Sequence, residues 1–127
     1  MPSRSPEKVI AESTARCRES GRLTWVVLDW LIQHIEEIDE ETLIRETEKS
    51  GDLSVLGVLS EAAHRRRPHP KFERIMAACS PHAELEPFFH RVARSQLALR
   101  LTREKALDLF RRWNYLCSGL RYLDGAA

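Results

Sequence analysis

Signals that begin and end helices recur along this chain at short intervals, and they constrain its fold more than any other feature. Ser5-Pro6 offers an N-cap followed by proline at the first helical position, and Asp39 and Asp52 are placed to cap later helices. Apolar residues between such signals recur at spacings of three and four, and no Asn-Gly or Asp-Gly turn separates alternating apolar segments. The sequence therefore predicts an all-α protein. The residues placed to end helices are Ser20-Gly21, Gly51, Pro68 and Pro70.

We expect six or seven short-to-medium helices joined by short loops and packed as a compact bundle. The most apolar segment, residues 24–38, is too long for an ordinary strand and apolar on most sides, which predicts a central buried helix. Gly57, within the next long helix, predicts a close helix crossing. Residues 71–79 are expected to form a short helix, and another should begin between residues 81 and 87. Thr102 would cap a last helix with an apolar seam at Leu109, Trp113, Leu116, Leu120 and Leu123.

A length of 127 residues predicts a single domain over residues 1–127, with frayed tails at 1–4 and 124–127. Hydrophobic residues make up 43% of the chain and charged residues 31%, a composition typical of globular rather than disordered chains. No apolar segment approaches the roughly 20 residues that span a bilayer, so we expect no membrane association. The three cysteines cannot all pair and match no zinc or redox spacing, which favours a reducing, cytoplasmic location.

Charge is distributed unevenly along the chain. Residues 1–60 carry 7 basic and 12 acidic side chains, whereas residues 61–127 carry 13 basic and 7 acidic ones. This asymmetry favours an acidic partner or nucleic acid for the second half, or head-to-tail association of two copies. The acidic helix at 40–48 would then be a separate face for a basic partner or a second copy. The alternative is that the two halves neutralise each other inside the fold.

The densest charge feature is the run Arg65-Arg66-Arg67, which Lys71 and Arg74 extend. Clustered, flexible cations suit contacts with phosphates or with an acidic protein surface. The alternative is that the three arginines offset the dipole at the end of their helix and are otherwise solvated.

A second candidate surface lies on the expected last helix. Arg112, Tyr115, Gly119 and Tyr122 recur there at spacings of three and four, and Arg111 borders them. Tyrosine and arginine are enriched at binding hot spots, and either a partner protein or a nucleobase could stack on them. The alternative is that this helix is covered on both faces, with its tyrosine hydroxyls hydrogen-bonded internally.

The sequence provides little support for a metal site or a catalytic site. Cys79 and His82, with His64, His69 and His90, are ligand types that zinc accepts, but Ser80-Pro81 interrupts the helix between the first two and the remaining spacings form no closed set. There is no nucleophile elbow, glycine-rich phosphate loop or His-Glu-x-x-His motif, so we expect no enzyme, no metal and no cofactor. Asp29, between Leu28 and Trp30, is expected to be partly buried and paired structurally.

These observations predict a non-catalytic accessory or adaptor subunit that acts by binding a protein, of the antitoxin, immunity or assembly-subunit type. Its size, helicity and charge split are common among unrelated bacterial accessory proteins and favour no family. The alternatives are a small nucleic-acid-binding subunit of a ribonucleoprotein complex and, below it, a small helical hydrolase with an Arg/His site. Homo-oligomerisation stays open. The candidate partner or nucleic-acid contacts are Arg65, Arg66, Arg67, Lys71, Arg74, Arg111, Arg112, Tyr115 and Tyr122.

Overall fold

The helices that begin at Pro6, Glu40 and Leu53 directly follow Ser5, Asp39 and Asp52, the capping residues that the sequence offers. Asp39 forms no side-chain cap, and Ser20, which was expected to end a helix, instead caps the helix that begins at Gly21 by accepting from the N–H of Leu23. The computed structural model describes residues 5–88 and 108–117. The Ser5 hydroxyl accepts a hydrogen bond from the backbone N–H of Lys8, and the Asp52 carboxylate accepts from the N–H groups of Ser54 and Val55. The helices are α1 (Pro6–Thr14), η1 (Cys17–Glu19, 3-10), α2 (Gly21–His34), η2 (Ile35–Glu37, 3-10), α3 (Glu40–Ser50), α4 (Leu53–Arg66), α5 (Pro70–Ala78) and α7 (Asp108–Arg111). The predicted all-α bundle is confirmed.

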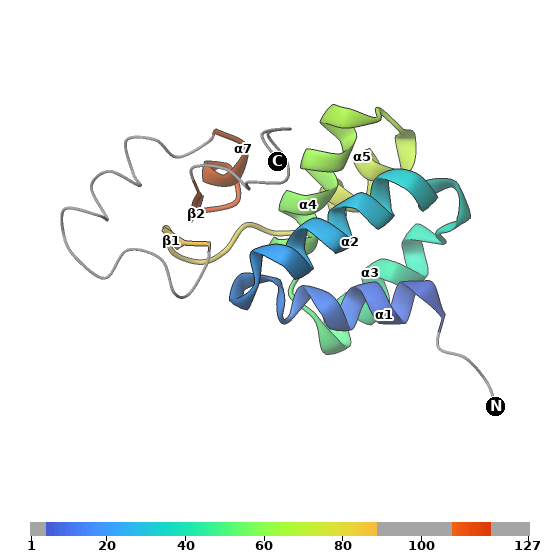
Figure 1. Ribbon diagram of the computed structural model, residues 1–127, viewed down its shortest axis with the longest axis horizontal. Helices are drawn as coiled ribbons and strands as arrows, with labels where there is room; N and C mark the ends of the chain where they lie inside the picture. The colour runs from blue at the N-terminus through green and yellow to red at the C-terminus, as the bar shows by residue number, and fades with distance from the viewer. Residues whose placement is uncertain (1–4, 89–107, 118–127) are drawn as a thin grey trace.

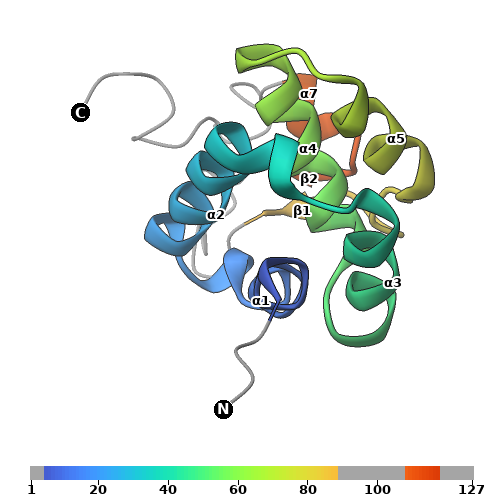
Figure 2. The ribbon, with the colours of Figure 1, turned by 90° about the vertical axis from the view of Figure 1, so that its right-hand side faces the viewer.

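Helix α4 runs through the middle of the bundle, with α2 and α5 on opposite sides and α1 and α3 packed together beneath it (Figure 2). Figure 1 shows α7 and two short strands at one end of the bundle. These strands, β1 (Glu86–Pro87) and β2 (Tyr115–Leu116), form a parallel pair of two residues each. No helix within the described ranges is long and apolar enough to cross a membrane.

The prediction of the central helix is wrong, because α4 and not α2 occupies that place. All ten residues from 54 to 63 are buried, whereas Val26 on α2 is 49% exposed. Small residues such as Gly57, Ala62 and Ala63 let neighbouring elements approach α4 on every side. The bulkier and more apolar α2 packs on the periphery, and part of its apolar circumference therefore faces outward.

The two glycines that the sequence singled out both serve close approaches. Gly51 ends α3 as the sequence predicts, and its φ of −124° is ordinary extended backbone. A Cβ there would lie 2.2 Å from the carbonyl oxygen of Ala11, so a glycine is needed to seat the end of α3 on α1. Gly57 does mark a close approach, but the group above it is the Trp113 ring rather than another helix.

The chain near its C-terminus departs furthest from the predicted elements. Within the described residues, helix α7 covers Asp108–Arg111, and Asn114 at φ 60° turns the chain into β2, so Trp113 and Tyr115 are not helical. Residues 81–88 form loop and strand and contain no helix. Other predicted features near this end lie outside the described residues, and so does the N-terminal tail 1–4. Those near the C-terminus are the helix cap at Thr102, His90, Gly119, Leu120, Tyr122, Leu123 and the tail 124–127.

Candidate interaction surfaces

Arg67 and Lys71, two members of the extended basic run, are engaged inside the molecule. Arg67 donates to the carbonyl oxygens of Ile32 (2.7 Å) and Gln33 (3.4 Å) and forms an ion pair with Glu36 at 2.7 Å. Lys71 donates from Nζ to the carbonyl oxygens of Glu36 and Ile38. The two cations therefore satisfy carbonyls at the end of α2 and along η2, where a helix end leaves acceptors without partners and favours positive charge.

One acid of the acidic helix, Glu40, is also paired inside the molecule. Arg74 Nε on α5 lies 3.0 Å from the Glu40 carboxylate at the start of α3. Together with Arg67 and Glu36, this pair joins the basic second half of the chain to the acidic first half. Internal neutralisation, the alternative that the charge asymmetry left open, therefore accounts for part of the charge on both sides.

Glu61 is a buried carboxylate that sequence reasoning missed. It lies in the middle of α4 with a side chain only 7% exposed, and it accepts hydrogen bonds from Trp113 Nε1 (3.1 Å), Arg112 (2.8 Å) and Arg65 (3.1 Å). The sequence signal that could have indicated this site is a single acid within a run of small and apolar residues, because such an acid needs a partner when the run is buried. Glu61 thus brings two predicted binding arginines, distant in sequence, to one carboxylate oxygen.

The arginines around Glu61 retain exposed surface. The side chains of Arg65 and Arg112 are 49% and 59% exposed. Arg66 and Arg111 are exposed as well, and Arg66 forms no ion pair with any other residue that the structure describes. This end of α4 and α7, together with the exposed side chain of Arg74 on α5, is the part of the predicted basic surface that remains on the outside.

The prediction that Tyr115 lies on an exposed stripe open to a partner is wrong. Its ring is fully buried, the Arg18 guanidinium lies 4.7 Å above it, and the His82 ring stacks on it at 5.1 Å. The Tyr115 hydroxyl forms a 2.6 Å hydrogen bond with Ser54 Oγ. The turn at Asn114 carries Tyr115 inward, where burial raises the pKa of its phenol.

A polar cluster surrounds Tyr115, and we call Arg18, His82, Glu86 and Tyr115 the clasp. Arg18 donates to the Phe88 carbonyl oxygen at 2.7 Å and pairs with Glu86 at 2.6 Å, while His82 lies 2.7 Å from the same Glu86 oxygen. The hydrogen bond from Arg18, more than its charge and that of His82, holds the pKa of Glu86 below its usual value. The clasp joins η1 to the loop after α5 and to β1 and β2.

The clasp unites an arginine and a histidine, but it does not form an open site. Arg18 is only 8% exposed, and its guanidinium already engages a carbonyl and a carboxylate. Neither of the two cavities described below is lined by a clasp residue. These contacts fasten η1 to the loop after α5 and to the two strands.

The remaining histidines and cysteines of the described residues have structural surroundings. His69 caps α5 by accepting from the N–H of Lys71, and His64 accepts from the N–H of His69. Burial raises the pKa of the Cys17 and Cys79 thiols to about 12, which disfavours the nucleophilic thiolate at neutral pH. Within residues 5–88 and 108–117, no three His, Cys, Asp or Glu side chains are placed to hold a metal ion.

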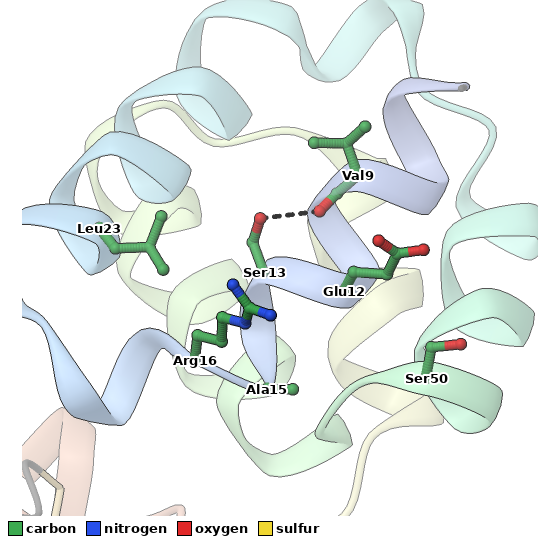
Figure 3. A pocket seen from close by; sticks show the side chains of 7 residues that line it. All are labelled: Val9, Glu12, Ser13, Ala15, Arg16, Leu23 and Ser50. Carbon is green, nitrogen blue, oxygen red and sulfur yellow. Dashed lines mark hydrogen bonds between the residues drawn. The ribbon is translucent and has the colours of Figure 1, made fainter. Parts of the chain in front are cut away.

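The surface that sequence reasoning missed is an apolar furrow between α1 and α2. A cavity of about 460 Å³ is lined by Pro6, Val9, Ile10, Ser13, Leu23, Val26, Val27 and Trp30. A second cavity of about 560 Å³ shares Val9, Ser13 and Leu23 with it and continues past Arg16 to Ser50. Figure 3 shows Val9 and Leu23 on either side of this second part, with Ser13 between them and its hydroxyl donating to the Val9 carbonyl at 2.8 Å.

The furrow exposes two large apolar side chains, one on each of its walls. Val9 is 44% exposed and Val26 49%, and Leu23 and Trp30 are partly buried between them. The apolar residues of α2 occupy more of its circumference than its contacts with α1 and α4 can bury. A detectable signal lay in the length and apolarity of residues 24–32, which sequence reasoning assigned to the core.

Comparison of the chain with models of protein families, with curated proteins and with solved structures finds no match, so its function has to be argued from the surfaces described above.

Proposed function

We propose that the protein is a small non-catalytic accessory subunit that acts by binding another protein chain, and that the furrow between α1 and α2 is its contact surface. The observation that carries the proposal is the exposure of Val9 and Val26 on the two walls of an apolar furrow. Contiguous exposed apolar surface of this kind marks interaction sites in soluble proteins. We place the protein among the antitoxin, immunity and assembly-subunit types that the sequence favours, with a cytoplasmic location.

The shape of the furrow supports a helix as the bound element. It runs between two helices, and its lining residues on α2, Leu23, Val26 and Trp30, recur at spacings of three and four. An amphipathic helix that inserts apolar residues at similar spacing would complete a three-helix contact. Trp30 would provide the large, partly buried anchor that such contacts commonly have.

Photo-crosslinking from the furrow tests this function. Benzoylphenylalanine in place of Val9 should give a covalent adduct with a protein chain in the native cells, whereas the same residue in place of the exposed Arg45 on α3 should give none. Retained helical circular dichroism would show that both variants fold. If neither position gives an adduct, the furrow is not a protein-binding surface and the proposal fails.

Nucleic-acid binding is the second candidate, because Glu61 draws Arg65 and Arg112 together at an exposed surface. A short RNA should then bind with an affinity that falls steeply with salt, and Arg66→Glu should weaken binding without unfolding the protein. Arg66 is the suitable variant because Arg67 also holds the end of α2. If anisotropy detects no binding of a labelled RNA at low salt, this candidate is excluded.

A further inference from the structure

The outer face of α2 carries two charged residues beside its exposed apolar stripe. Arg22 is exposed and Asp29 is half-buried, and neither forms an ion pair with any residue in the described ranges. Asp29 accepts a 2.9 Å hydrogen bond from Gln33 Nε2, which leaves its charge unneutralised. The predicted pairing of Asp29 is thus with an amide and not with a cation.

The order of these residues has a symmetry about Val26. With a rise of about 1.5 Å per residue, Arg22 lies about 6 Å before Val26 along the helix axis and Asp29 about 4.5 Å after it. At about 100° per residue, both charged residues lie on one side of Val26, whereas Leu23 and Trp30 lie on the other side, toward the furrow.

From this pattern we infer that the furrow binds a second copy of this chain, with α2 packed antiparallel on α2 around a two-fold axis near Val26. A two-fold axis perpendicular to both helices keeps residues on the same side of the contact and exchanges their ends. Arg22 of each copy then meets Asp29 of the other, Leu23 meets Trp30, and Val26 meets Val26. The inference rests on the proposed function and names the partner of that same surface.

The antiparallel arrangement provides partners for both the charged and the apolar residues of this face. Two symmetric ion pairs would form at the polar edge, and the exposed apolar surface of Val26 and Val9 would be covered at the furrow. The parallel arrangement would instead place Arg22 beside Arg22 and Asp29 beside Asp29, which is unfavourable. The charges thus select the antiparallel orientation, while the apolar contacts provide most of the affinity.

Sedimentation equilibrium of the purified full-length chain tests the inference. The wild-type protein should form a dimer, and Val26→Arg should raise its dissociation constant by at least about 100-fold, because two cations would meet at the axis. Arg22→Asp and Asp29→Arg should each raise it by about 10-fold or more. The double variant Arg22→Asp/Asp29→Arg should return it to within about threefold of wild type, because the exchanged charges pair again. Arg45→Asp, the same charge change on α3, is the control and should have no effect.

The outcomes separate this inference from the proposed function. The inference is overturned if the chain stays monomeric at all concentrations. It is also overturned if Val26→Arg leaves the dissociation constant unchanged, or if the double variant does not restore it. The crosslink from position 9 distinguishes the two cases: an adduct with twice the mass of the chain supports the second copy. An adduct with a different protein leaves the furrow as a binding surface but overturns its assignment to self-association.

Discussion

The extended basic run on α4 and α5 and the outer face of α2 differ in whether their side chains have partners inside the molecule. Arg67, Lys71 and Arg74 bind carbonyls and carboxylates of α2, η2 and α3, so much of this positive charge is neutralised internally. Val26 and Arg22 have no such internal partner among the described residues. The comparison teaches that a binding surface is indicated by side chains whose interactions remain unmet, and that charge density alone is a poor guide to one.

The largest effect is expected in the buried part of α4, at Gly57, where the Trp113 ring packs against the helix. A Cβ at Gly57 would lie 2.3 Å from Trp113 Cζ3, so Gly57→Ala should destabilise the protein by about 3 kcal/mol through overpacking. Chemical denaturation measures this loss. In a Trp113→Ala background the same substitution should stabilise by up to about 1 kcal/mol, because alanine is the better helix former. A stabilising effect in the wild-type background would show that Trp113 does not cover Gly57.

The next largest effect is expected at Glu61. Glu61→Gln removes the charge that binds Arg65, Arg112 and Trp113, and we expect a loss of about 2 kcal/mol in unfolding free energy. The half-exposed arginines limit the loss, because water can solvate them in the variant.

Glu41→Gln on the exposed face of α3 is the matched control for Glu61 and should change stability by less than about 0.5 kcal/mol. Equal effects at the two positions would contradict the role of Glu61 in fixing Trp113 and Arg112 to α4.

Local signals predicted the helices of the first 80 residues well, because the signals are themselves short-range. Ser5 and Asp52 cap helices within three residues of their own position, and such bonds depend on no other part of the chain. The sequence misplaced the central helix because burial is decided by which element others can approach. Gly57 and Ala63 make α4 that element, although residues 24–32 are more apolar.

The candidate site was predicted less well, because it depends on contacts between distant residues. The pairing of Arg67 with Glu36 and of Arg18 with Glu86 joins residues 31 and 68 positions apart, which no local pattern reveals. The apparent helical stripe through Tyr115 failed because α7 ends at Arg111 and Asn114, with its positive φ, turns the chain inward. The predicted residues that the structure keeps exposed are Arg65, Arg66, Arg74, Arg111 and Arg112.

Adjacent arginines give a direct test of the internal role of the basic run. Arg67→Ala should lower the unfolding free energy by about 1 kcal/mol, because it frees the Ile32 carbonyl and breaks the pair with Glu36. Arg66→Ala should leave it within about 0.3 kcal/mol, because Arg66 is exposed and unpaired among the described residues. Thermal melts of both variants make the comparison, and equal losses would place the two arginines in one role.

The clasp should make a smaller contribution to the free energy of unfolding, and this contribution should depend on pH. The folded protein holds the pKa of Glu86 below its ordinary 4.5, so the contribution of Glu86 is present above that pH and is lost as the pH falls through the folded-state value. It should stay below about 1 kcal/mol, because the Glu86 side chain is 38% exposed and water screens the pair. Denaturation of wild type and Glu86→Gln between about pH 6 and pH 3 measures it. A difference that grows on acidification would contradict this sign.

The smallest effect is expected on the furrow side, where Val26→Gln should change the stability of the isolated chain by no more than about 0.5 kcal/mol. Val26 is 49% exposed, so the substitution removes little buried surface, and glutamine is at least as good a helix former as valine. The measurement belongs at the lowest workable protein concentration, because association would add a concentration-dependent term to the stability. A loss above about 1.5 kcal/mol there would mean that Val26 is packed within its own chain. A loss that appears only at high concentration would instead follow from burial between copies, as the antiparallel contact requires.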